Sequence, residues 1–258
     1  MFPIIQGVPE RIFGVDGISP PGSEMEVRAR TRRWPEGAEG DAPVGVLGVL
    51  ADNATGYAVI AGGAPGYWSV TTELSLDVFN PIPTDGSILK ASASLVHSNG
   101  SIGFSDGQVL DSRGGIVAGI RQRGLYILGY PASPRHPTAE VAPDSKPDGL
   151  DDMFGAFNDR VHLPVTRSMV NPMGNLHGGV GLCLVEWASS RAFREGSGEA
   201  LRTIGVHVVY LRAAPLGTRL RVNSEVVHRG RSLGSCRVAV CDDAGRLLLE
   251  ATVTAGAA

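Results

Sequence analysis

Residues 171–179 read NPMGNLHGG, and a long apolar stretch, GGVGLCLVEWASSRAFRE, begins inside them at Gly178. This stretch is apolar on nearly every side of a helix, which indicates a helix buried against a sheet. It contains Glu186, nine residues after His177. A candidate strand, DRVHLPVTRS (159–168), comes before the loop, and about four strands with glycine-containing turns come after the helix. This half of the chain therefore reads as strand, loop, buried helix and antiparallel strands.

The first half of the chain repeats this pattern. A candidate strand, EMEVRARTRR (24–33), precedes the apolar stretch VGVLGVLADNATGYAVI, in which Asp52 aligns with Glu186 at an offset of 134 residues. The strands behind the helices align at an offset of 131, where Phe79 matches Tyr210. An internal repeat of this kind indicates a duplicated fold unit. Further matched pairs, the last three at an offset of 130, are Gly86 and Gly217, His97 and His228, Gly100 and Gly230, Ser105 and Ser235, and Gly115 and Gly245.

A polar, proline-rich segment separates the two copies. PASPRHPTAEVAPDSKPDGLDD (131–152) has no hydrophobic periodicity, which is typical of a linker. We therefore expect an N-terminal extension over 1–22, a first domain over 23–130, this linker, and a second domain over 153–258.

Composition narrows the class of protein. Of 258 residues, 43% are hydrophobic and 19% are charged, with a net charge of −3, so the chain can bury a core and lacks the basic face that nucleic acid requires. Three cysteines without a C-x-x-C pair favour a reducing compartment. The most apolar segment, Val44 to Gly63, is interrupted by Asp52 and Asn53, which argues against a bilayer span, and the N-terminus lacks the features of a signal peptide. We expect a cytoplasmic protein without nucleic acid or membrane partners.

The loop and helix of the second half resemble a known enzyme family. The pattern N-x-x-G-x-x-H-G-G, with an acid nine residues after the histidine, is similar to that of the hotdog-fold acyl-CoA thioesterases of the PaaI / 4-hydroxybenzoyl-CoA thioesterase superfamily. With the repeat, the resemblance implies an α+β tandem (double) hotdog, in which two antiparallel sheets each wrap around a central helix and pack as a pseudo-dimer. It also implies hydrolysis of an acyl-CoA to a free acid and CoA without a metal or redox cofactor, and by analogy a homo-oligomer of tandem chains.

The residues of the motif suit thioester chemistry. The first turn of a helix offers free N–H groups and the positive end of the helix dipole. Gly178 has no Cβ, so a substrate carbonyl can approach its N–H and receive oxyanion-type stabilisation, with Gly179 beside it in the substrate-binding loop. The carboxylate acts as a general base on water or as a direct nucleophile. By resemblance, Asn171 helps to hold substrate or water, and a hydroxyl on the next strand assists the acid.

In single-hotdog relatives the site lies between two subunits, so a tandem chain is expected to hold two unequal sites between its halves. The hydroxyls, counted back from Phe79 and Tyr210, are Thr72 and Thr203. Site one combines the complete loop with the acid of the first half: Asn171, His177 and Gly178 with Asp52 and Thr72. Site two combines Glu186 and Thr203 with the degenerate loop Pro43, Val44 and Gly45. We predict one working site with Asp52 as its carboxylate; a site built within one half would use Glu186 instead.

The sequence also contains features typical of other classes of protein. Gly103-Phe-Ser105-Asp-Gly107 matches the G-x-S-x-G nucleophile elbow, but the residues after Gly107 read as a strand and a turn, whereas the elbow requires a strand-to-helix turn. The six scattered histidines form no metal motif. A non-catalytic acyl-CoA-binding hotdog protein remains the main alternative, and a hotdog hydratase or dehydratase is a third. The arginines at 212, 229 and 231 are candidates for contacts with the phosphates of CoA, or for solvated turns.

Overall fold

The computed structural model describes residues 7–17, 24–38, 40–129, 147–155, 161–194 and 201–257. The first half begins with the short helix α1 (Val8–Ile12) and strand β1 (Val15–Gly17), followed by β2 (Glu24–Arg30). A 3₁₀ turn, η1 (Val44–Leu47), leads directly into the central helix α2 (Gly48–Ala61). Four long strands follow, which are β3 (Tyr67–Val78), β4 (Ile88–Ser98), β5 (Ile102–Leu110) and β6 (Ile116–Leu128).

The second half has the same order of elements, except that its described residues include no counterpart of β1. It comprises helix α3 (Leu150–Phe154), β7 (Val161–Pro164), the 3₁₀ turn η2 (Arg167–Met169), the central helix α4 (Gly178–Arg194), β8 (Leu201–Tyr210), β9 (Arg219–Arg229), β10 (Leu233–Asp242) and β11 (Leu247–Ala257). Most of the expected linker, residues 131–146, lies outside the described residues, and its last part begins α3. Residues 7–17, which we expected to be an extension, are built into the first half, because β1 pairs with β2.

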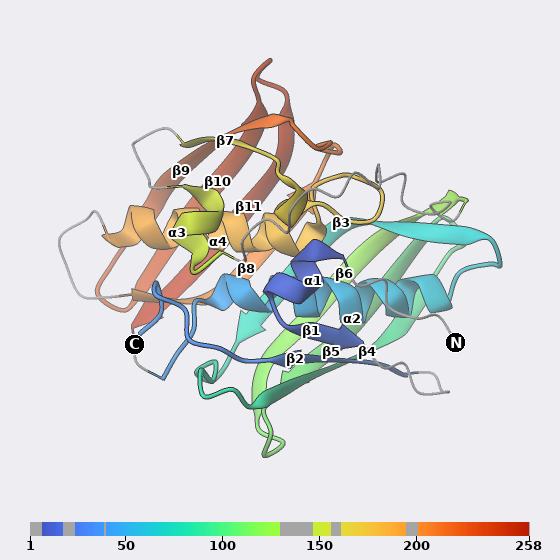
Figure 1. Cartoon of the computed structure of the whole chain (residues 1–258), viewed down its shortest axis with the longest axis horizontal. Coiled ribbons are helices and arrows are strands. Elements are labelled where there is room, and N and C mark those ends of the chain that lie inside the picture. The colour runs from blue at the N-terminus through green and yellow to red at the C-terminus, as the bar shows by residue number, and fades with distance from the viewer. Residues whose placement is uncertain are drawn as a thin grey trace.

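The strands form one antiparallel sheet. Their order is β1-β2-β4-β5-β6-β3-β8-β11-β10-β9-β7, and the two long helices lie against it, as Figure 1 shows. The predicted α+β architecture, with a central helix and a set of antiparallel strands in each half, is confirmed. The two expected sheets are joined edge to edge, since β3 pairs with β8 from Glu73 opposite Val209 to Asp77 opposite Gly205.

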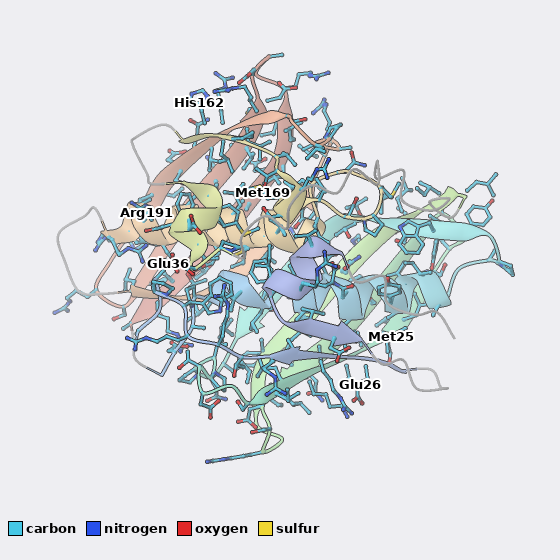
Figure 2. All side chains as sticks on the ribbon, viewed as in Figure 1. Met25, Glu26, Glu36, His162, Met169 and Arg191 are labelled. Carbon is cyan, nitrogen blue, oxygen red and sulfur yellow. The ribbon has the colours of Figure 1, made fainter. Side chains whose placement is uncertain are left out.

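Side-chain alternation explains how the sheet covers its helices. On β2, Met25 is buried, while its neighbour Glu26 faces the other way and pairs with Arg28 and Lys90 (Figure 2). The central helix of the first half is enclosed on nearly all sides. The span Val44–Ala61 is long and apolar enough to cross a membrane, but 78% of it is buried inside this fold, as in the core helix of a globular protein.

The two central helices meet at their N-terminal ends. Gly48 at the start of α2 lies against Gly179 near the start of α4, so closely that a Cβ on either residue would collide with the carbonyl oxygen of the other. This contact brings the start of α4 next to Asp52 on α2, and the η1 turn that leads into α2 next to Glu186 on α4. The halves therefore share one junction, on which both candidate sites depend.

Candidate active site

A cavity of about 340 Å³ lies at the junction of the two halves. The first half contributes one face of α2, including Asp52, Gly56 and Ile60, together with part of β3. The second half contributes its loop over 171–178 and residues at the end of β8. Polar groups gather where the two helices meet, and apolar side chains line much of the remainder. The further apolar lining includes Tyr57, Trp68, Leu125, Leu176, Leu248 and Leu249.

Asp52 lies in this cavity with hydrogen bonds to both halves. Its Oδ2 accepts the backbone N–H of Gly179 at 2.9 Å, and its Oδ1 accepts the hydroxyl of Thr71 at 2.8 Å. Only 9% of Asp52 is exposed. A carboxylate of the first half is therefore held directly against the helix start of the second half.

We expected the hydroxyl beside Asp52 to be that of Thr72, but it belongs to Thr71. β3 carries a bulge here, since Thr71 pairs with Gly124 and Glu73 pairs with Arg123. The Thr72 hydroxyl instead donates to the carbonyl of Arg123 at 3.2 Å, although the residue still lines the cavity.

A matching bulge in β8 shows that the alignment of the two copies is off by one residue here. It falls between Gly205 and Thr203, so the equivalent of Thr71 is Thr203, 132 positions later. Aligning Phe79 with Tyr210 gives 131 and shifts the first threonine by one.

Gln122 fixes the direction of the Thr71 hydroxyl. Its Nε2 donates to Thr71 Oγ1 at 3.1 Å, and its Oε1 accepts the hydroxyl of Thr55 at 2.6 Å. Since Thr71 Oγ1 accepts from Gln122, its own proton is directed at Asp52. Gln122 is 2% exposed, so this chain of hydrogen bonds is shielded from water except where it opens on the cavity.

The start of α4 forms the opposite wall. Gly178 is the first residue of this helix, so its N–H has no acceptor within the helix. A Cβ added to Gly178 would lie 2.7 Å from Asp52 Oδ2, so the close approach of acid and helix requires glycine. The hydroxyl of Tyr210 donates to the Gly178 carbonyl; burial and the charge of Asp52 raise the pKa of Tyr210 well above its usual range and keep it protonated.

Asn171 organises the loop that leads to α4. Its Oδ1 accepts the backbone N–H groups of Met173 at 3.0 Å and Asn175 at 3.2 Å, which makes a local turn. Because Oδ1 is engaged in this turn, the Nδ2 group is the part of the side chain left to reach a ligand in the cavity that Asn171 lines.

His177 lies between two carboxylates. Its Nδ1 is 3.1 Å from Asp52 Oδ2, and its Nε2 is 3.1 Å from Glu10 Oε1. Burial lowers the pKa of His177, but the hydrogen bonds and charges of Asp52 and Glu10 outweigh burial and raise that pKa to about 10. Burial raises the pKa of Glu10, and His177 brings it below its usual value. The Gly179 N–H, which donates to Asp52 Oδ2, also points at His177 Nδ1 at 3.0 Å, and the raised pKa of His177 favours a ring with protons on both nitrogens at neutral pH.

Two family models match the chain. The one described as "Thioesterase superfamily" matches residues 173–249, and the one described as "Acyl-CoA thioesterase C-terminal domain" matches residues 5–126. Between them they take in most of both halves, including Asp52, Thr71 and Gly178. The chain belongs to the hotdog-fold thioesterase superfamily. It is a thioester hydrolase.

Solved structures share the double architecture. The thioesterase is 11% identical to the tesB protein of Mycobacterium avium subsp. paratuberculosis, with 95% of this chain and 96% of that chain covered and a TM-score of 0.64. It is 10% identical to the acyl-CoA thioesterase II TesB2 of Mycobacterium marinum, with 96% and 95% covered and a TM-score of 0.60. For an acyl-ACP thioesterase of Bacteroides thetaiotaomicron the values are 10% identity, 90% and 98% coverage and a TM-score of 0.62. No curated protein matches the sequence. At these identities the likeness shows the fold.

The second pseudo-site of this thioesterase is closed around Glu186. Its carboxylate accepts the N–H of Gly45 at 3.2 Å and the hydroxyls of Thr203 at 2.8 Å and Ser190 at 2.7 Å. Val44 stands where the first site has Gly178, and both Val44 and Glu186 are 2% exposed. Glu186 is thus placed like Asp52, but it is not among the residues that line the cavity.

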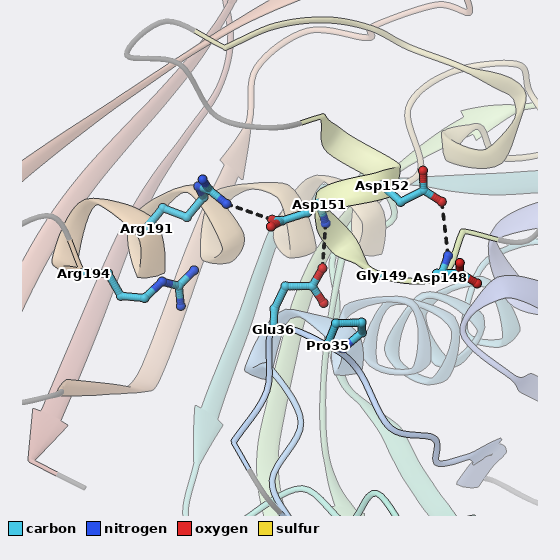
Figure 3. A pocket seen from close by; sticks show the side chains of 8 residues that line it. All are labelled: Pro35, Glu36, Asp148, Gly149, Asp151, Asp152, Arg191 and Arg194. Carbon is cyan, nitrogen blue, oxygen red and sulfur yellow. Dashed lines mark hydrogen bonds and ion pairs between the residues drawn. The ribbon is translucent and has the colours of Figure 1, made fainter.

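A larger hollow in the thioesterase lies elsewhere, between α3 and the end of α4. It has a volume of about 540 Å³ and is lined by charged groups, some of them paired: Asp151 accepts from Arg191 at 2.9 Å and donates its N–H to Glu36 at 2.8 Å (Figure 3). These contacts join α3 to both halves. Among the described residues, no group of three or more His, Cys, Asp or Glu could hold a metal ion.

The rival serine motif is structural. Ser105 lies within β5, is fully buried, and donates its hydroxyl to the Thr55 carbonyl at 2.9 Å. A nucleophile elbow needs an exposed serine at a strand-to-helix turn, so this geometry excludes it. Of the three arginines, Arg212 lines the cavity, while Arg229 donates to the carbonyl of Phe193.

Sequence reasoning missed several groups of the site. Glu10 lies in a segment without periodicity, and nothing local signals its contact with His177, which is 167 residues away. Gln122 is one of many polar residues on strands. Thr71 lies next to the threonine that we predicted, and an alignment of the two strands at an offset of 132 would have found it.

Proposed function

We propose that this thioesterase hydrolyses acyl-CoA at a single composite site between its halves, with Asp52 as general base and the start of α4 as oxyanion site. One observation carries the proposal: Asp52 from the first half and Gly178 from the second line the same cavity, while Glu186 does not. The two halves then differ in role. The first supplies the acid, and the second supplies the electrophilic pocket.

The reaction follows from these positions. The thioester carbonyl oxygen accepts a hydrogen bond from the N–H of Gly178, which with the helix dipole stabilises negative charge as it develops. A water molecule beside Asp52 Oδ1 attacks the carbonyl carbon and transfers a proton to the carboxylate. The tetrahedral intermediate breaks its C–S bond, and the CoA sulfur leaves as a thiolate that takes the proton back from Asp52. The products are the free acid and CoA.

The hydrogen bonds of Asp52 favour a base over a nucleophile. Both of its oxygens accept donors, one from Gly179 and one from Thr71, which fixes the carboxylate and lowers its tendency to attack carbon. A water molecule beside the Gln122–Thr71 pair can find both hydrogen-bond donors and acceptors. Water held there needs only the transfer of one proton to become the attacking group.

The two ends of the cavity suit the two ends of an acyl-CoA. The exposed residue Arg212 lies on its lining and presents a cation suited to the phosphates of CoA. The acyl group extends along α2, past Gly56 toward Ile60 and Trp68, where the lining is apolar.

We further propose that the reaction uses no metal or redox cofactor and takes place in the cytoplasm. Hydrolysis balances with water and the groups above. The three cysteines, Cys183, Cys236 and Cys241, are free, in keeping with a reducing compartment.

The test is a free-thiol assay with a panel of acyl-CoA substrates on the wild type, Asp52→Asn and Glu186→Gln. The two substitutions remove the same charge from equivalent positions on α2 and α4. We expect Asp52→Asn to lose at least about 100-fold in kcat, as for loss of a general base, and Glu186→Gln to keep its activity once folding is verified. Loss confined to Glu186→Gln would place the site within the second half, and a folded wild type that releases no thiol would refute hydrolysis of acyl-CoA.

A further inference from the structure

The short helix α1 reaches the active site from outside both central helices. It contacts η2 of the second half and α2 of the first, and it places Glu10 inside the cavity wall. Glu10 is 2% exposed, His177 is 6% exposed and Asp52 is 9% exposed. A buried charge is costly unless it is paired, so three ionisable groups at this depth must act as one cluster.

The two oxygens of Glu10 have separate contacts. Oε2 accepts the N–H of Gly7 at 2.8 Å and so caps the start of α1. Oε1 accepts Asn53 Nδ2 at 3.2 Å and lies 3.1 Å from His177 Nε2. Because Asn53 follows Asp52 on α2, Glu10 is fixed relative to both the acid and the imidazole.

We propose that Glu10 is a positioning residue of the active site, which holds the His177 imidazole against Asp52 and thereby sets which oxygen of Asp52 faces the reacting water. This inference rests on the proposed function. With Nε2 held by Glu10, the ring presents Nδ1 to Asp52 Oδ2, which also accepts the N–H of Gly179. Oδ1, bound to Thr71, is left as the oxygen that takes the proton.

Charge balance gives Glu10 a second role. A histidine cation paired with Asp52 alone would neutralise the base, whereas a cation shared between two carboxylates leaves the cluster with one net negative charge. Only Glu10 and Asp52 form ion pairs with His177 among the described residues. The other titratable side chains on the cavity lining are Tyr57, Tyr210 and Arg212. Glu10 therefore keeps the site basic while the ring stays charged.

The substitution that tests this is Glu10→Gln, made in the full chain. An amide in this place must direct its NH₂ group at the Gly7 N–H or at Asn53 and His177, so at least one donor faces another donor. The substitution changes charge and hydrogen bonding with almost no change in volume. Glu26→Gln, which removes a surface ion pair with Arg28 and Lys90, is the matched control.

Two readouts separate positioning from simple stabilisation. The first is NMR titration of ¹⁵N-labelled histidine, with the His177 signals assigned from a His177→Gln variant. We expect the wild-type ring to stay doubly protonated between about pH 6 and 9, and Glu10→Gln to bring its titration into that range; Glu26→Gln should change nothing. The second is kinetics, where Glu10→Gln is expected to lower kcat about 10-fold with a smaller change in KM, and to have no further effect in the His177→Gln background.

Each outcome decides the matter. A wild-type His177 that titrates near its ordinary pKa, or a Glu10→Gln variant with unchanged titration and kcat, would overturn the inference. An equal loss from Glu10→Gln with and without His177 would also overturn it, because Glu10 would then act independently of the ring. The NMR titration needs no substrate, so it distinguishes failure of this inference from failure of the proposed hydrolysis, which the thiol assay on the wild type reports.

Discussion

Replacing Thr71 by valine removes one hydroxyl from the reacting end of the site and keeps the side-chain shape. The Thr71→Val variant loses the 2.8 Å hydrogen bond to Asp52 Oδ1 and leaves Gln122 Nε2 without its acceptor at 3.1 Å. A hydrogen bond to a charged group contributes about 1.5–3 kcal/mol, so kcat should fall about 10- to 150-fold if the bond orients the base in the transition state.

The repeat supplies matched controls for this substitution. Thr203→Val removes a bond of the same length, 2.8 Å, to Glu186 in the closed pseudo-site. It should cost a similar amount of stability, about 1–3 kcal/mol, and leave kcat within about 3-fold of wild type. Thr72→Val tests the register, since that hydroxyl only donates to the Arg123 carbonyl.

The assay is steady-state release of CoA thiol, with thermal unfolding of each variant measured in parallel. The reasoning would be refuted if Thr203→Val or Thr72→Val lost as much kcat as Thr71→Val. It would also be refuted if all three variants retained wild-type turnover, because the hydroxyl would then have no part in the chemistry.

Two further predictions concern the helix start and the buried histidine. Gly178→Ala puts a Cβ 2.7 Å from Asp52 Oδ2 and should lower kcat/KM at least about 10-fold. Val44→Ala, at the equivalent position of the first half, should destabilise the fold but retain activity. Equal activity in the two variants would contradict the assigned site. Because the folded pKa of His177 is raised to about 10, its contribution to stability is complete below its unfolded pKa near 6.5 and is lost as pH rises through 10. The free energy of unfolding, measured with denaturant at each pH, should therefore fall between about pH 6.5 and 10, and it should fall less steeply with pH in His177→Gln. The same dependence on pH in both proteins would contradict the ion cluster.

Much of the fold could be predicted from sequence because the duplication makes each half confirm the other. The apolar runs at 44–60 and 178–195 predicted buried helices, and the structure has the central helices α2 and α4 at these places. Residue 195 lies outside the described residues. The way in which the two half-sheets join was harder to predict from the sequence. Whether two half-sheets stay separate or pair through β3 and β8 depends on which strand lies at the exposed edge of each sheet, and the pattern of residues in β3 and β8 did not show this.

The residues of the site that belong to the sequence motif could be predicted. The pairing of Asp52 with the start of α4 followed from the cross-half arrangement, and the contact with Gly179 has that form. Thr71 was missed because the two strands align at an offset of 132 around their matching bulges, whereas the match of Phe79 with Tyr210 gave 131. Glu10 could not be predicted, because it lies on a five-residue helix and its contact with His177 forms only in the folded chain. No pattern in the sequence indicates this contact.

The most direct test of the central claim counts binding sites. Titration calorimetry with a non-hydrolysable thioether analogue of the best acyl-CoA substrate measures how many molecules bind to each chain. One composite site predicts one analogue per chain, with the Gly178→Ala variant weakened and the Val44→Ala variant unchanged. Two equivalent analogues per chain would contradict it, because the pseudo-site around Glu186 would then be open to substrate.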